Sequence, residues 1–225
     1  MGRLTKLHDD IHVLAIPHTF FGLSLGTRMT VLRLPDRSVA LFSPVPIDDA
    51  LAAELAAIGE VAHVIAPNVY HHMHAAGAMQ RYPKAKLHAA KELRRKRPDL
   101  RIDADFDDAT RLGDGITPVR IRGSMMGETV LVHAPSETLI SVDLVENFDT
   151  PAPDLYTRLY LRAGGIENRV GWSRFLKLVY RDKREARRSL DEVIALPWDR
   201  AIVAHGSVLA RGAKQSVRDA LAWVR

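Results

Sequence analysis

The sequence predicts an αββα sandwich, an α/β (α+β) fold in which two mixed β-sheets pack face to face under helices. Two observations lead to this prediction. Apolar residues make up 47% of the 225 residues, which is enough to bury a large core. The chain also divides into two halves, each of which opens with strand patterns and closes with helical patterns. No repeat or low-complexity linker marks a boundary, so we expect a single domain over residues 1–225.

The first half combines a hairpin with alternating strands and helices. Pro35-Asp36-Arg37 predicts the hairpin turn, and Gly59 ends an amphipathic helix. Strands are predicted over 11–16, 27–34, 38–43, 63–66 and 85–89. Helices are predicted over 49–58 and 73–81, followed by a basic helix that Pro98 ends.

The second half contains an antiparallel meander, a helical insert and a last strand and helix. Strands are predicted over 117–122, 129–133, 138–142 and 201–204, and the terminal helix over 214–224. The insert covers about 154–196 and is broken near Gly164-Gly165 and Gly171. Its large apolar residues fit core packing, a lid or the interface of a homodimer. If the insert caps a site, Tyr156, Tyr160 and Trp172 are its candidate substrate contacts.

Composition and charge limit the partners. Without cysteine, the chain has neither disulfides nor thiolate ligands, so His, Asp, Glu or Asn must hold any metal. The net charge of +5 is concentrated in residues 91–101 and 181–188. Acidic residues interrupt both stretches and no aromatic residues interleave, which favours solvated helices over a nucleic acid partner. The alternatives are nucleic-acid binding and the guidance of a phosphorylated or carboxylated small substrate toward a nearby site. The start lacks an apolar leader and no stretch could span a bilayer, which favours a cytoplasmic protein without a membrane partner.

Polar side chains follow three predicted strands, where binding sites commonly form. His71 and His72 follow the strand at 63–66, Asp143 follows the one at 138–142, and His205 follows the last strand. Imidazole and carboxylate groups are ligands for transition metals. Adjacent residues point in different directions, so we expect only one of His71 and His72 to enter a shared site. Asp143 also fits a purely structural role in capping backbone amides, and Gly206 after His205 fits a simple turn.

The order of these motifs resembles the metallo-β-lactamase superfamily, most closely a branch of it whose function is not established. The matching segments are Ala66-Pro67-Asn68 with His71-His72, Tyr82-Pro83-Lys84-Ala85, residues 133–147 and Ala204-His205-Gly206. The resemblance implies the αββα fold and metal-dependent hydrolysis. The sequence departs from the motif His-x-His-x-Asp-His of active members, because the corresponding stretch contains no aspartate. No histidine lies in residues 123–127 either, where a middle ligand is expected, and His133 is the only candidate replacement.

These departures favour one metal ion over two. His71, His72, Asp143 and His205 are the predicted ligands, with Asp143 and His72 also assigned to catalysis. Asn68 and His133 are predicted to orient them, although His133 on its strand also fits a core histidine. We predict a hydrolase that uses a metal-activated water on an ester, amide or phosphoryl group of a small molecule. Zinc is the expected ion, with iron or manganese as alternatives. The competing hypothesis is an inactive, metal-free domain that binds a small molecule or a protein partner.

Overall fold

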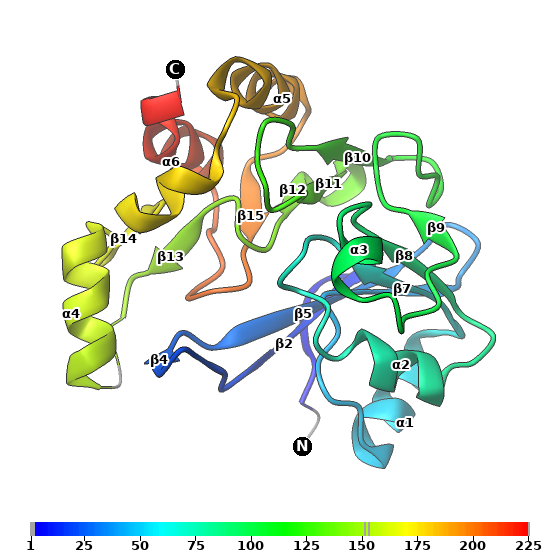
Figure 1. Ribbon diagram of the computed structural model, residues 1–225. Helices are drawn as coiled ribbons and strands as arrows, with labels where there is room; N and C mark the ends of the chain where they lie inside the picture. Colours follow the sequence, from blue (N-terminus) through cyan, green and yellow to red (C-terminus); the bar gives the residue numbers. More distant parts are fainter. Residues whose placement is uncertain (1–2, 151, 153, 225) are drawn as a thin grey trace.

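The computed structural model describes residues 3–150, 152 and 154–224. The extreme ends of the predicted domain, residues 1–2 and 225, therefore lie outside the described residues. Two sheets lie in the middle of the molecule, and helices cover their outer faces (Figure 1). This arrangement confirms the predicted αββα sandwich.

The first sheet has seven strands in the order β1-β2-β5-β6-β7-β8-β9. Its first four strands are antiparallel neighbours, whereas β6, β7, β8 and β9 run parallel. Parallel strands end at the same edge, so the loops after them meet there. The strands are β1 Thr5–His8, β2 Ile11–Ile16, β5 Thr27–Arg33, β6 Val39–Phe42, β7 Val61–Ala66, β8 Lys86–Ala89 and β9 Ala104–Asp105.

The second sheet has four strands in the order β10-β11-β12-β15. They are β10 Ile116–Arg120, β11 Thr129–His133, β12 Thr138–Ile140 and β15 Arg200–Ile202. The pairs β10 with β11 and β11 with β12 are antiparallel, whereas β12 and β15 are parallel. In this last pair Ile140 lies opposite Ile202, which fixes how the loops after the two strands are aligned.

Side-chain alternation along the strands divides the core into layers. In β6, Val39 and Leu41 pack under the helices of the first sheet, whereas Ala40 and Phe42 face the second sheet. The helices over the first sheet are α1 Asp49–Ile58, α2 Ala75–Arg81 and α3 Leu93–Lys96. The helices over the second sheet are α5 Lys183–Ala195 and α6 Ala213–Ala220, followed by the 3₁₀ turn η3 Ala222–Val224.

The predicted insert is helical at both ends and contains one strand. It consists of α4 Leu155–Gly164, β14 Arg169–Gly171, the 3₁₀ helix η2 Arg174–Val179 and α5. The α4 helix ends where the sequence predicts, because Gly165 adopts φ +73°, a conformation that glycine accommodates easily. β14 pairs with β13 Glu146–Phe148, which the sequence analysis did not predict.

Several boundaries differ from the sequence predictions, mostly where elements are short. The predicted basic helix is reduced to the single turn α3, and the strand predicted over 138–142 ends at Ile140. A 3₁₀ turn, η1 Ala134–Ser136, joins β11 to β12, and a hairpin of β3 Thr19–Phe20 and β4 Leu23–Ser24 went unpredicted. Strands of two residues carry too little alternation to be recognised from sequence. Among the described residues no helix combines the length and apolarity needed to cross a membrane.

Candidate metal centre

Three side chains from separate loops converge at one edge of the sandwich. His71 lies in the loop between β7 and α2, Asp143 follows β12, and His205 follows β15. Asp143 and His205 each lie three residues beyond the paired Ile140 and Ile202, so the parallel register brings them side by side. One potential ligand atom from each of the three residues lies within 4.8 Å of the others.

Asp143 lies at the centre of this group. Its Oδ1 atom is 3.3 Å from His71 Nε2 and 3.2 Å from His205 Nε2. Burial alone would raise the pKa of Asp143, but His71 and His205 outweigh it and lower that pKa well below its usual range. For His205, burial alone would lower the pKa, but the hydrogen bond to Asp143 and its charge raise it to about 9.

The other ring nitrogen of each histidine is also held. His205 Nδ1 donates to the carbonyl oxygen of Gly26 at 2.8 Å, and His71 Nδ1 is 2.8 Å from Ser43 Oγ. These contacts fix the orientation of both rings and direct Nε2 toward Asp143. Metal-binding histidines commonly use one nitrogen in this way while the other binds the ion.

Asn68 connects Asp143 to the histidine loop. Its Nδ2 atom donates to Asp143 Oδ2 at 2.6 Å, and its Oδ1 accepts the backbone N–H groups of Tyr70 and His71, both at 2.8 Å. The side chain is fully buried. One amide therefore positions two of the three converging residues.

His72 lies outside the converging group, which corrects its prediction as a ligand and catalytic residue. Its Nδ1 atom is 3.2 Å from the guanidinium of Arg97. Burial, with the charges of Lys96 and Arg97, lowers the pKa of His72 to about 4, so the ring accepts a hydrogen bond from Arg97. The cause is local geometry, because neighbouring residues of a turn direct their side chains differently.

His133 is also remote from the centre, contrary to its predicted role in orienting a ligand. It is the last residue of β11 and pairs with Thr138, the first residue of β12. Asp143 lies beyond the other end of β12. The antiparallel direction of β11 therefore places His133 at the opposite edge of the sheet, where its Nδ1 atom is 2.7 Å from Ser136 Oγ.

A pocket of about 370 Å³ opens over the three converging residues. Tyr156 and Tyr160 of the insert line it, as does the β3–β4 hairpin with Phe20 and Phe21. Figure 1 shows β4 near α4, and the backbone N–H of Ser24 donates to Thr157 Oγ1 at 2.9 Å. The hairpin and the insert thus form adjoining walls of the pocket.

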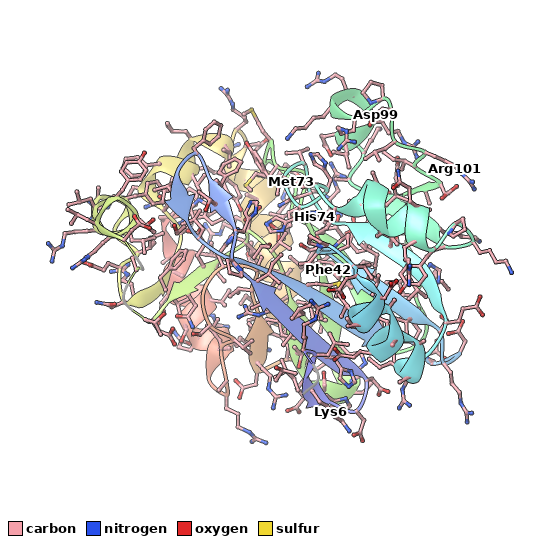
Figure 2. All side chains as sticks on the ribbon, turned by 90° about the horizontal axis from the view of Figure 1, so that it is seen from below. Lys6, Phe42, Met73, His74, Asp99 and Arg101 are labelled. Atoms are coloured by element: carbon pink, nitrogen blue, oxygen red, sulfur yellow. The ribbon has the colours of Figure 1, made fainter. Side chains whose placement is uncertain are left out.

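The loop after β7 contributes another wall. Met73 and His74, which line the pocket, are labelled near the middle of the molecule in Figure 2. Trp172, the third predicted substrate contact, is buried in the core against Tyr180, with ring centroids 5.6 Å apart. Its prediction as a substrate contact is corrected, because the apolar spacing that suggested it reflects core packing.

Comparison with known proteins gives matches among solved structures. No protein-family model matches the chain, and no curated protein matches it. A metallo-β-lactamase from Pontibacter korlensis superposes with a TM-score of 0.67 at 12% identity, over 98% of this chain and 97% of that one. A metallo-β-lactamase from Hirschia baltica gives a TM-score of 0.63 at 11% identity, over 98% and 96%. This chain has the metallo-β-lactamase fold.

The fold also occurs in part of a larger protein. The metal-soaked Flv1 flavodiiron core from Synechocystis sp. PCC6803 superposes with a TM-score of 0.66 at 14% identity. That match covers 98% of this chain and 60% of the other. At such identities the similarity establishes the fold alone.

Two buried ionisable residues, Glu128 and Arg28, support the loops that carry Asp143 and His205, and the sequence alone did not identify them. Glu128 accepts the backbone N–H groups of Val142 at 2.9 Å and of Asp143 at 3.1 Å. Burial, with the nearby charge of Asp143, raises the pKa of Glu128 to about 8. Arg28 donates to the carbonyl oxygens of Val203 and Gly206, on either side of His205. The signal in the sequence is an ionisable residue inside an otherwise apolar strand, for Arg28, or directly before one, for Glu128.

A third buried carboxyl lines the pocket itself. Glu146, on β13, is only 3% exposed. Among the described residues its Oε2 atom has no hydrogen-bond partner. Burial raises the pKa of Glu146 to about 7.

Proposed function

We propose that this protein is a metal-dependent hydrolase with one divalent ion held by His71, Asp143 and His205. The convergence of two imidazoles and one carboxylate at the floor of a pocket carries this proposal. Three protein ligands with room for water and substrate are typical of catalytic metal sites. The metallo-β-lactamases among the structural neighbours support the assignment through their names.

The donor set fits such an ion. The carbonyl of Gly26 accepts from His205 Nδ1, so a neutral His205 would present the lone pair of Nε2 to the ion. Asn68 donates to one oxygen of Asp143 and leaves the other directed at the histidines. Nitrogen and oxygen ligands of this kind suit zinc, and also iron or manganese.

The chemistry follows from the ion and the pocket. When bound, the ion would make a water nucleophilic near neutral pH and polarise the substrate oxygen. Asn68 keeps Asp143 oriented, and Ser43 keeps the ring of His71 in place. The largely apolar walls exclude bulk water and hold the substrate, for which we propose a small molecule with an ester, amide or phosphoryl group.

A metal-free binding domain is the second candidate function. Asp143 Oδ1 lies within 3.3 Å of both Nε2 atoms, so a protonated His205 satisfies this carboxylate with the protein's own groups. The pocket would then bind a small molecule without chemistry.

Metal content distinguishes the two candidates. We expect untagged protein to bind about one equivalent of zinc, iron or manganese. His205→Ala should bind less than about a tenth of this amount, since it removes one ligand of three. His72→Ala is the matched control, because His72 faces Arg97, and it should retain the metal.

Elemental analysis and calorimetric titration with zinc provide the measurement. Absence of uptake by the parent would exclude the hydrolase mechanism and favour the binding domain. Equal loss of metal in His72→Ala and His205→Ala would contradict the proposed ligand set.

A further inference from the structure

Glu146 and Glu128 are buried carboxyl groups of the same site, but their contacts differ. Both are 3% exposed. Glu128 is satisfied by two backbone N–H groups. By contrast, Glu146 Oε2 has no hydrogen-bond partner among the residues that the structure describes. Buried polar groups without partners are rare and each calls for an explanation.

Glu146 is held at the pocket wall by its backbone. β13 pairs with β14 so that Glu146 lies opposite Gly171. The next residue, Asn147, donates its backbone N–H to the carbonyl oxygen of His205 at 3.1 Å. The carboxyl group therefore belongs to a segment hydrogen-bonded directly to the metal-ligand loop, and it lines the same pocket.

The rest of the lining is mainly apolar. Besides the converging residues, the pocket is lined by aliphatic and aromatic side chains that include Leu23, Leu25, Tyr160 and Leu176. Binding pockets commonly combine such walls with a few polar groups that orient the ligand. A volume of about 370 Å³ suits a small molecule.

We propose that Glu146 is the polar recognition residue of this pocket, and that the ligand is a largely apolar molecule whose N–H or O–H group donates to Glu146. When it is ionised, above its pKa of about 7, the carboxylate of Glu146 only accepts hydrogen bonds, so it selects a donor. The inference rests on the proposed function where it defines the substrate class. Donor recognition itself needs only the pocket and Glu146.

Matched probes test this recognition. 4-Phenylbutan-1-ol has an O–H donor, whereas its methyl ether has the same apolar body without one. We expect the protein as purified, at a pH above the pKa of Glu146, to bind the alcohol at least about tenfold more tightly than the ether, as measured by calorimetry. Glu146→Leu has a similar volume and no acceptor, and it should reduce this preference to less than about twofold. Tyr156→Ala is the control, since it should weaken both probes to a similar degree.

Stability provides a second readout. Because Glu146 Oε2 has no hydrogen-bond partner in residues 3–150, 152 and 154–224, Glu146→Leu should leave the melting temperature unchanged or raise it. A clear fall would show that the carboxyl is structural and would overturn the proposal. Absence of alcohol binding by the parent, or an unchanged preference in Glu146→Leu, would also overturn it.

Metal analysis of the same samples separates this inference from the proposed function. Donor preference that depends on Glu146 in a protein that takes up no metal would refute the hydrolase and support the recognition role. Normal metal content without donor preference would support the proposed metal site and refute the recognition role of Glu146.

Discussion

Two serine–histidine pairs of nearly equal length lie in different parts of this molecule. Ser43 Oγ is 2.8 Å from His71 Nδ1, and Ser136 Oγ is 2.7 Å from His133 Nδ1. The second nitrogen of His71 faces Asp143 at 3.3 Å, whereas His133 lies at the opposite edge of its sheet. A serine that orients a histidine therefore does not define a site. The groups that face the second ring nitrogen decide its role.

Strand direction explains the difference between the pairs. β12 and β15 run parallel and lead into Asp143 and His205. β11 runs antiparallel to β12, so its final residue, His133, reaches the far edge. There its ring packs edge-on against His8, with centroids 5.8 Å apart. Two histidines that both end strands thus acquire different surroundings.

Replacing His71 or His133 by alanine should give the largest difference in zinc affinity between the two serine–histidine pairs. His71→Ala should weaken zinc affinity by about 100-fold or more, because it removes one of three ligands. His133→Ala should leave affinity within about twofold of the parent, because the ring is remote from the centre. Competition with a chelating dye measures both values. Similar losses in the two variants would contradict the assignment of the centre to one edge.

Glu128 is buried beside Asp143, whereas Glu137 is exposed at the edge that holds His133. Replacing each by alanine should change the free energy of unfolding by different amounts. Glu128→Ala leaves the N–H groups of Val142 and Asp143 unpaired, and should lower the free energy of unfolding by about 2–4 kcal/mol. Glu137→Ala, beside Ser136, removes an exposed side chain and should cost less than about 1 kcal/mol.

Urea denaturation measures both variants, and Glu128→Gln tests the mechanism. The glutamine side chain would still present an acceptor oxygen, so this variant should recover most of the loss. Failure of the recovery would indicate that the carboxyl group at position 128 does more than accept these two hydrogen bonds.

In metal-free protein the pKa values of His205 and His133 should be shifted in opposite directions from the ordinary value for histidine. Asp143 raises the pKa of His205 to about 9, whereas burial lowers that of His133 below 6.5. The His205 ion pair therefore stabilises the fold fully below pH 6.5, and its contribution, on the order of 3 kcal/mol, is lost as pH rises through 9. Titration of the ring protons by NMR measures these values. Asp143→Asn should return the pKa of His205 toward or below 6.5.

The smallest effect should come from the serines. Ser43→Ala removes the partner of His71 Nδ1 and should weaken zinc affinity by about tenfold. Ser136→Ala removes the equivalent partner of His133 and should not change zinc affinity. The same chelator competition measures this pair. A loss in Ser136→Ala would show that the two edges are coupled through the sheet.

Patterns within single elements were informative on their own. Alternation predicted β2 over Ile11–Ile16, and helical spacing predicted α1 over Asp49–Ile58. The positions of His71, His72, Asp143 and His205 directly after predicted strands indicated a site at strand ends. Local alternation and spacing are preserved in the sequence because each residue's face follows from its position in the element.

The directions of individual side chains and their long-range hydrogen bonds could not be predicted from such local patterns. The sequence offered His71 and His72 equally, and only the turn geometry directs one to Asp143 and the other to Arg97. The roles of Glu128 and Glu146 also depend on long-range contacts. In the described part of the chain the Glu128 carboxyl accepts backbone N–H groups, whereas Glu146 Oε2 has no hydrogen-bond partner.

The sequence by itself determined the layered fold class, the positions of most strands and the polar residues that follow them. The tertiary structure decided which residues meet, because strand order, direction and register bring distant segments together. Those pairings depend on burial across the whole sandwich, which no local pattern records.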